Sequence, residues 1–299
     1  MTYTPKQTQS FLIRRFQQVG IRPKTKHGQN FLIDLNLLGL LCQTAQLDAG
    51  DVVLEVGTGT GSLTALMARQ AAHVVSVEVD PQMHQLAGEE LIDFENVTLL
   101  RADVLKNKNT LNPVVVEAVQ RQLAEAPGRR FKLAANLPFN VATPLVSNLL
   151  ASEIVPATMT VTIQKELADR ILARPSTKDY GALSVWVQSQ CQVELVRLMP
   201  PSVFWPRPKV TSAIIQAIVR QDWRERIPDL AFFHSFVRTM FFHRRKFLRS
   251  VLYSGYKDRL SKADIDDCMR QLGLGETARA EELDVPAVLR LCEAVRLRL

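Results

Sequence analysis

Short apolar runs alternate with helix-like segments through the first half of the chain. Between these runs, apolar positions recur at helical spacing, as in the segment that follows Gly61. Apolar strands that alternate with helices predict a parallel sheet covered on both faces. We therefore expect an α/β fold with a Rossmann-like sheet. Its predicted strands are residues 51–56, 74–79, 97–100, 131–135 and 158–163.

The pattern changes after residue 164. Residues 164–173 have helical spacing, residues 183–196 have a strand-like pattern, and residues 203–219 carry several prolines before another strand. From about Asp222 onward the pattern is almost wholly helical. The helices expected there are residues 230–242, 244–252, 262–272 and 285–296. We place a boundary near residue 221, between a domain of residues 1–221 and a smaller all-α domain of residues 222–299.

Two segments of the first domain lie outside the strand–helix alternation. Residues 7–19 predict a short helix, and a basic loop follows that ends in the string GQNFL at residues 28–32. The connection between Asp103 and Asn136 is unusually long for two neighbouring strands. Because its central part has an amphipathic helical pattern, we expect a surface insertion near residues 106–130.

A glycine-rich turn follows the first strand of the predicted sheet. Gly57, Gly59 and Gly61 alternate with threonines and open a helix, and glycines there allow positive φ and close approach of a ligand. Both NAD-dependent enzymes and methyltransferases use such a turn. The NAD fingerprint requires a third glycine where Ser62 stands, so an NAD-dependent oxidoreductase is the less favoured alternative.

Polar residues end the strands that come after this turn. Glu78 ends the second strand, where an acid can bind ribose hydroxyls, and Asp103 follows the third, where a carboxylate can accept from an adenine amino group. Asn136 ends the fourth strand. Ligands of open α/β sheets bind outside the carboxyl ends of the strands. The spacing therefore predicts a site for an adenosine-containing cofactor beside Gly57.

The string Asn136-Leu137-Pro138-Phe139 suits the binding of an exocyclic amine on a nucleobase. The side-chain carbonyl of Asn136 can accept a hydrogen bond from an amino group. Pro138 stiffens the turn, so that the Leu137 carbonyl can be held as a second acceptor, and Phe139 offers a face on which a flipped base can stack. The alternative interpretation of the string is an ordinary exit from a strand.

The charge of the chain favours a polyanionic partner. The net charge is +7, from 37 Lys and Arg against 30 Asp and Glu. The basic residues form two clusters, which suits an extended nucleic acid better than a small phosphate ligand. The first contains Arg14, Arg15, Arg22, Lys24 and Lys26, and the second contains Arg238, Arg244, Arg245, Lys246 and Arg249.

Other features of the composition argue against several classes of protein. The four cysteines are scattered with no CxxC pair, and the five histidines form no HExxH arrangement, so we expect reduced thiols and no metal. No apolar run approaches the roughly 20 residues of a membrane-spanning helix. The start of the chain lacks the pattern of a secretory signal. We expect a cytoplasmic monomer without membrane contact.

Longer strings of the chain resemble the KsgA-type ribosomal RNA adenine N6,N6-dimethyltransferases. GQNFLID at residues 28–34 together with NLPFNVATPL at residues 136–145 is quite specific for this family. The resemblance covers most of the chain. Its other strings are EVGTGTGSLT at 55–64, SVEVD at 76–80, VFWPRPKVTSA at 203–213, FFHRRKFLRSVL at 241–252 and ARAEELDV at 278–285.

This resemblance implies a fold, a cofactor and a reaction. The sheet would be that of a methyltransferase that uses S-adenosylmethionine (SAM), with Asn30 and Leu32 closing over the cofactor and Gly57 along its methionine part. The family's cofactor positions fall on Asn30, Leu32, Gly57, Glu78, Asp103 and Asn136. The implied reaction is dimethylation of adenine N6 in small-subunit ribosomal RNA during subunit biogenesis.

The resemblance also places the catalytic and RNA-binding residues. The catalytic string is Asn136-Leu137-Pro138-Phe139, and the RNA-binding residues are Arg244, Arg245, Lys246 and Arg249. The chain departs from the family pattern at Thr58, where Pro is usual and a looser turn is expected, and at Phe139, where Tyr is usual. The alternatives are a resistance-type methyltransferase of large-subunit RNA and an assembly factor that acts by binding the immature small subunit.

Overall fold

The computed structural model describes residues 7–20, 23, 29–243 and 246–299. The chain forms two compact units. Unit 1 contains Met1–Ala168 and Glu194–Val219, and unit 2 contains Asp169–Val193 and Arg220–Leu299. Our sequence boundary near residue 221 lies beside the second junction. Residues 169–193, which the sequence pattern placed in the first domain, are part of unit 2.

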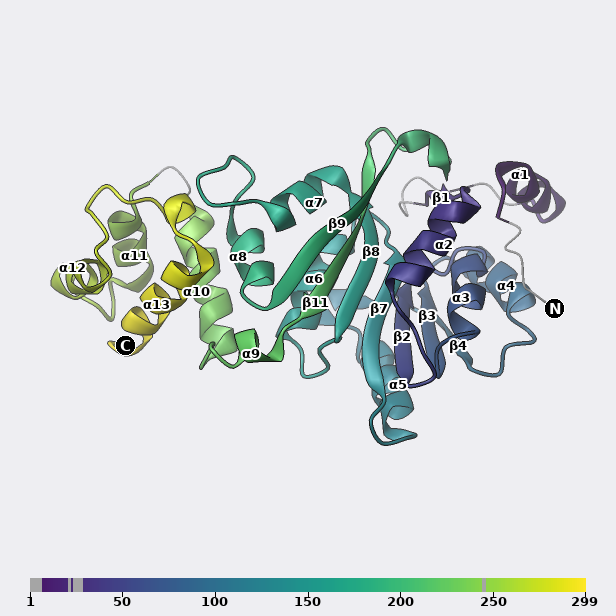
Figure 1. Ribbon diagram of the computed structural model, residues 1–299, viewed down its shortest axis with the longest axis horizontal. Coiled ribbons are helices and arrows are strands. Elements are labelled where there is room, and N and C mark those ends of the chain that lie inside the picture. The colour runs from purple at the N-terminus through teal and green to yellow at the C-terminus, as the bar shows by residue number, and fades with distance from the viewer. Residues whose placement is uncertain (1–6, 21–22, 24–28, 244–245) are drawn as a thin grey trace. The chain divides into compact units, whose positions relative to one another are not determined.

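Unit 1 is built on a seven-stranded sheet of the described residues, in the order β4-β3-β2-β7-β8-β11-β9 (Figure 1). The first five strands of that order are parallel, and β11 is antiparallel to β8. The expected α/β fold is confirmed, as are the five predicted strands. The strand bounds are β2 Asp51–Val56, β3 His73–Glu78, β4 Val97–Arg101, β7 Arg130–Asn136, β8 Thr158–Gln164, β9 Cys191–Met199 and β11 Ser212–Val219.

Helices cover both faces of this sheet. Most residues of the central strands are apolar because both faces of the sheet are covered, and every residue of β2 is buried, including Asp51 and Glu55. α2 (Leu35–Thr44) and α3 (Ser62–Ala68) share a core cluster with Val53 and Val74 of the sheet. α4 (Pro81–Glu90) packs on β3 and β4, and α6 (Ala142–Ala151) follows β7 in the chain (Figure 1).

The long connection before β7 belongs to this covering layer. It contains the small hairpin β5 (Leu105–Asn107) and β6 (Thr110–Leu111), followed by α5 (Pro113–Ala124). The amphipathic helix expected here is confirmed. However, α5 packs against β2, β3 and β7 and buries Val115 and Val119. The surface insertion that we expected near residues 106–130 is therefore a crossover segment of the sheet.

Unit 2 is mainly helical. α10 (Leu230–Phe242) packs against α8 (Ala182–Gln188), α11 (Leu248–Tyr256) and α13 (Val285–Arg296), and α12 (Lys262–Gln271) completes this group. The helices predicted beyond residue 230 are confirmed, although α11 begins at Leu248 rather than at Arg244, which lies outside the described residues. α7 (Lys165–Leu172) spans the junction of the units, and α9 (Gln221–Arg224) is a single turn.

The strand that we expected at residues 183–196 is half wrong. Its second part lies in β9, but residues 182–188 form α8. Leu183, Val185, Trp186 and Val187 of that helix are all buried, so it has no polar face. A short helix that is buried all round carries the same continuous apolar run as a buried strand, and periodicity cannot separate the two.

A small second sheet and the first helix lie beside β2 and α4 in unit 1. β1 (Phe31–Leu32) pairs antiparallel with β10 (Phe204–Trp205). α1 (Gln9–Gln18) buries Leu12 and Phe16 in a cluster with Phe31 and with Met83 of α4. The N-terminal segment is therefore anchored next to the carboxyl ends of the strands. Within the described ranges, no helix is long and apolar enough to cross a bilayer.

Candidate active site

A pocket of about 230 Å³ opens at the carboxyl ends of β2, β3 and β7. β2 and β7 are neighbours, but the chain passes through β3 and β4 between them, so this edge is a topological switch point of the sheet. The lining comes from residues 29–31, 56, 57, 59, 77–79, 83, 102–104 and 136–141. Every predicted cofactor-binding and catalytic residue except Leu32 lies on this wall.

Leu32 is buried in the core rather than in the wall of the pocket. Its side chain is 0% exposed and packs with the residues of α2 and β2, while its neighbour Phe31 lines the pocket. Successive residues of a strand point to opposite sides, so only one of this pair can face a ligand. Leu32 could therefore affect cofactor binding only indirectly, by fixing the position of β1.

The glycine turn and the Asn136 string lie directly against each other. Gly57 has φ +86°, and its backbone N–H donates to the Val77 carbonyl at 2.8 Å. A Cβ at Gly57 would stand 3.1 Å from Pro138 Cδ. Because this contact is tighter than ordinary van der Waals distance, a side chain at residue 57 would push the Pro138 ring away. Because residue 57 has no side chain, the glycine turn and the Asn136 string can lie in direct contact and line one site.

Glu78 presents a carboxylate that is fixed at both oxygens. It is 5% exposed, Oε2 accepts from the Gly59 N–H at 3.0 Å, and Oε1 accepts from the Asp80 N–H at 2.9 Å. Burial raises the pKa of Glu78, and the two backbone hydrogen bonds act in the opposite direction. Each oxygen keeps further acceptor capacity, which suits a pair of hydroxyl donors such as those of a ribose.

Asn136 is oriented by the N-terminal loop. Its Nδ2 donates to the backbone carbonyl of Asn30 at 3.0 Å, so the amide nitrogen is engaged and Oδ1 is the atom left to accept. The Leu137 N–H donates to Thr162 of β8 at 3.2 Å, while no hydrogen bond within the described chain uses the Leu137 carbonyl. Asn136 Oδ1 and this carbonyl are the two acceptors that the sequence predicted.

The rest of the string and Asp103 complete the pocket. The Val141 N–H donates to the Pro138 carbonyl at 3.1 Å, which closes the turn around the half-buried ring of Phe139. Asp103 is exposed at the rim, where its Oδ1 accepts from the Leu105 N–H at 2.9 Å. The site thus offers hydrogen-bond acceptors and an aromatic face around a partly enclosed space. Among the described residues, no group of His, Cys, Asp or Glu could hold a metal ion.

A buried hydrogen-bond network supports the glycine turn from behind. Glu55 is 1% exposed, and its Oε2 accepts from Thr64 Oγ1 and from Ser76 Oγ, both at 2.5 Å. Burial raises the pKa of Glu55 to about 8, although both hydrogen bonds lower it. Thr58, which we expected to loosen the turn, is buried and lies 2.6 Å from Ser76 Oγ through its hydroxyl.

A contact made by Gln7, near the N-terminus, could not be predicted from the sequence pattern. The amide of Gln7 is buried, and its Nε2 donates to the Leu32 carbonyl at 2.9 Å while its Oε1 accepts from Thr60 Oγ1. Gln7 therefore connects β1 with the glycine turn. Phe31 and Met83 on the pocket wall also went unpredicted. Phe31 lies in β1 and Met83 in α4, and an apolar residue in either element indicates packing but does not reveal a ligand site.

The predicted RNA-binding residues differ in their surroundings. Lys246 is exposed. Arg249 forms a bidentate ion pair with Asp266, in which Nη2 lies 2.6 Å from Oδ2. Arg244 and Arg245 lie outside the described residues. Spacing on a helix could place these cations on one surface, but it could not show which of them already has an acidic partner.

Comparison with known proteins gives consistent matches along the chain. The family model described as ribosomal RNA adenine dimethylase matches residues 20–293. The chain is 36% identical over 280 residues to a protein of Streptococcus gordonii named ribosomal RNA small subunit methyltransferase A, covering 93% of each chain. It is 35% identical over 289 residues to the protein of that name from Listeria innocua, covering 96% of this chain and 94% of that one.

Solved structures match the fold. A dimethyladenosine transferase from Plasmodium falciparum superposes with a TM-score of 0.72 at 22% identity, covering 88% of this chain and 96% of that one. The 23S rRNA methyltransferase ErmE superposes with a TM-score of 0.61 at 24% identity, covering 89% of this chain and 100% of that one. At these identities the likeness concerns the fold alone.

Proposed function

The chain belongs to the ribosomal RNA adenine dimethylase family, and we propose that it dimethylates N6 of adenine in small-subunit ribosomal RNA with SAM as the methyl donor. The observation that carries this proposal is the contact of Gly57 with Pro138, which brings the cofactor turn against the amine-binding string. Relatives at 35–36% identity over more than nine-tenths of the chain are named small-subunit methyltransferases, which supports the choice of RNA.

The residues of the pocket fit SAM. Glu78 offers an anchored carboxylate to the ribose hydroxyls, and Asp103 offers one at the rim to the adenine amino group. Gly57 leaves its backbone open to the methionine part because no side chain covers it. When bound, SAM supplies a methyl group that its sulfonium already activates. The remaining task of the protein is to align the acceptor nitrogen.

The acceptor nitrogen of adenine is a poor nucleophile, because its lone pair is delocalised into the ring. Asn136 Oδ1 and the Leu137 carbonyl accept the two amino hydrogens and favour a more pyramidal nitrogen, whose lone pair is then available. The same acceptors stabilise the positive charge that develops on this nitrogen during transfer. The Asn30 carbonyl, by holding Asn136 Nδ2, keeps Oδ1 turned toward the amine.

Phe139 holds the base by stacking. A base that reacts at an exocyclic amine must leave its helix, and an aromatic face compensates part of the lost stacking. Phe139 provides this face without the hydroxyl of the usual Tyr. No side chain of the string has to act as a base, because the alkylated nitrogen becomes acidic and releases its proton to water. The monomethylated amine then rotates and reacts again.

The substrate in this proposal is immature small-subunit RNA in the cytoplasm, and the enzyme acts as a monomer. Lys246 and the neighbouring arginines would contact phosphates of the RNA, with Arg249 held by Asp266. Phosphate contacts make binding fall steeply as salt rises. Binding to RNA that does not change with salt would contradict this part of the proposal.

The choice of RNA can be tested by offering competing substrates. The full-length protein is incubated with methyl-labelled SAM and, separately, with immature small subunits, protein-free small-subunit RNA and protein-free large-subunit RNA. We expect label in the small-subunit substrates, with the immature subunit preferred. Label in large-subunit RNA alone would overturn the proposal in favour of a large-subunit enzyme. Stoichiometric binding of small subunits without label would favour the assembly factor.

A further inference from the structure

Unit 2 contains a second hollow on the surface of α10 and α11. Its volume is about 470 Å³, and its polar lining comes from His234, Ser235, Arg238, Thr239, His243 and Ser254. Gly255 keeps the space between the two helices narrow, since a Cβ at that position would lie 2.5 Å from Thr239 Cγ2. The hollow is thus made by two closely packed helices, with hydroxyls, imidazoles and one guanidinium on its wall.

The charge of this hollow favours an anion. No carboxylate lies among its lining residues, and Arg238 takes part in no ion pair within the part of the chain that the structure describes. By contrast, Arg249 on α11 is held by Asp266. The His234 ring lies tilted against Trp186, with the ring centroids 4.4 Å apart, and burial together with Arg238 lowers the pKa of His234. Arg238 is therefore an arginine of the hollow without an acidic partner among the described residues.

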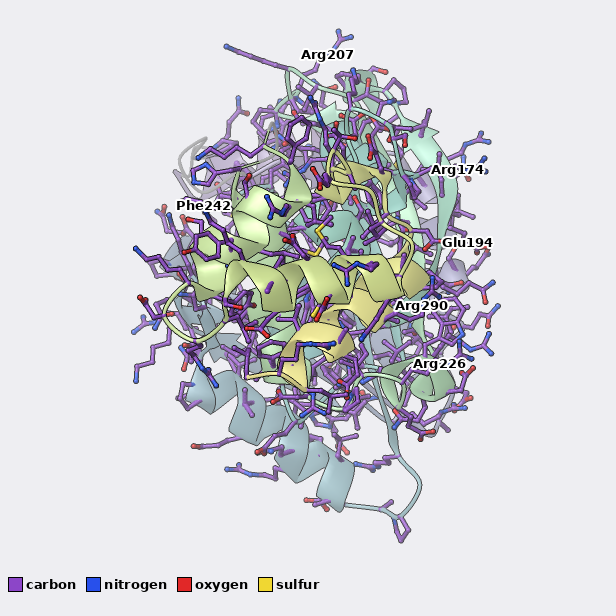
Figure 2. The ribbon with its side chains drawn as sticks, turned by 90° about the vertical axis from the view of Figure 1, so that its left-hand side faces the viewer. Arg174, Glu194, Arg207, Arg226, Phe242 and Arg290 are labelled. Carbon is purple, nitrogen blue, oxygen red and sulfur yellow. The ribbon has the colours of Figure 1, made fainter. Side chains whose placement is uncertain are left out.

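An exposed aromatic ring stands at the edge of the hollow. Phe242, the last residue of α10, lines the hollow and is 78% exposed, which is unusual for a large apolar side chain. The His243 ring meets it edge to face, with the centroids 4.7 Å apart. Figure 2 shows Phe242 beside α10, apart from the labelled Arg290. An exposed ring next to an unpaired arginine is the arrangement that binds a base and its phosphate.

We propose that this hollow binds one unstacked nucleotide of the RNA substrate, with Arg238 on its phosphate and Phe242 stacked on its base. The inference rests on the proposed function, because it takes the partner to be RNA. It adds an anchoring site in unit 2 that is separate from the target base at Asn136. Serine and threonine hydroxyls on the wall supply neutral hydrogen bonds to the sugar and phosphate.

The test measures RNA binding by full-length variants across a salt series. Arg238→Gln is expected to weaken binding and to reduce the slope of log K against log salt by about 1, because one phosphate contact is lost. Phe242→Ala is expected to raise Kd about 10-fold with the slope unchanged, and Phe242→Trp to restore it. Arg290→Gln is the matched control, because it removes an exposed arginine of α13 that also has no ion pair among the described residues.

Two results would overturn the inference. The first is binding by Arg238→Gln and Phe242→Ala that equals binding by Arg290→Gln. The second is weaker binding to immature subunits with unchanged binding to protein-free RNA, which would assign the hollow to an acidic protein segment. Methylation by the wild-type protein is measured in the same preparations. Normal methylation with unchanged binding by the variants refutes only the hollow, whereas absence of wild-type methylation refutes the proposed function.

Discussion

Glu78 and Asn136 in the pocket of unit 1 differ from Arg238 and Lys246 in unit 2 in how their side chains are held. In the pocket, Glu78 is fixed at both oxygens, and Asn136 is fixed at its nitrogen. In unit 2, Arg238 lies in a hollow without an acid, and Lys246 is exposed. Fixed groups suit a reaction that depends on alignment, whereas unpaired cations suit a partner recognised by its charge.

The largest effect is expected from Asn136→Ala. Removing the anchored acceptor should lower methyl transfer by about 10³-fold, because the amine loses one of the two groups that orient it, while SAM binding changes little. Transfer is measured with labelled SAM, and SAM binding by titration calorimetry. Asn148→Ala is the matched control, since its Nδ2 also donates to a backbone carbonyl, that of Lys108, outside the pocket. Near-normal turnover by Asn136→Ala would remove Asn136 from the mechanism.

Gly57→Ala should give the next largest effect. The new methyl group would displace Pro138, so transfer should fall about 10²-fold and SAM should bind more weakly. Gly128→Ala is the control for backbone strain. Gly128 also has positive φ, but nothing lies within 4 Å of its Cβ position, so this variant has the strain without a steric contact. Both variants lose some stability to strain. Equal losses of transfer in the two would contradict the role of the Pro138 contact.

Phe139 tests the stacking side of the pocket. Phe139→Ala should raise the KM for RNA by a factor that corresponds to roughly 1–3 kcal/mol, because the flipped base loses its aromatic neighbour. Phe139→Tyr keeps the ring and should be tolerated. The KM for SAM should stay the same in both. If alanine and tyrosine reduced RNA use equally, the ring would not be the functional part of this residue.

A separate prediction concerns stability rather than methyl transfer, through the buried Glu55. Its folded pKa, about 8, lies above the value of about 4.3 in an unfolded chain. The proton is therefore bound more tightly in the folded state, and its stabilising contribution is complete below pH 4.3 and lost as pH rises through 8. Wild type should lose stability relative to Glu55→Gln between these values, with a slope of at most about 1.4 kcal/mol per pH unit.

Chemical denaturation at several pH values measures this slope. Glu153→Gln serves as the control, because it makes the same side-chain change at an exposed position. Identical pH profiles of wild type and Glu55→Gln would show that Glu55 titrates normally despite its burial. Such a result would weaken the view that the glycine turn rests on a rigid, buried network.

Much of unit 1 could be predicted from the sequence, because its site follows from topology. Strands such as 51–56 are mainly apolar, and parallel strands bring Gly57, Glu78 and Asn136 to one edge. What could not be predicted depends on side-chain contacts across long sequence separations. The bonds of Gln7 to Leu32 and Thr60 leave no pattern in the sequence, and neither does the choice of Phe31 over Leu32 for the pocket wall.

Less of unit 2 than of unit 1 could be predicted from the sequence. The amphipathic helices after residue 230 were clear, but α8 has no polar face and was mistaken for a strand. The basic cluster was also visible, yet its members are not equivalent. Arg249 has an acidic partner 17 residues away, and Arg238 has none among the described residues. Ion pairs depend on how two helices pack, which the order of charged residues does not reveal.

The most direct test of the central claim is the identity of the methylated base. Immature small subunits are incubated with the full-length protein and SAM, and their RNA is digested to nucleosides and analysed by mass spectrometry. We expect N6,N6-dimethyladenosine in small-subunit RNA with wild-type protein and none with Asn136→Ala. Methylation of another base or another atom of adenine, or dimethyladenosine formed equally by Asn136→Ala, would contradict this expectation.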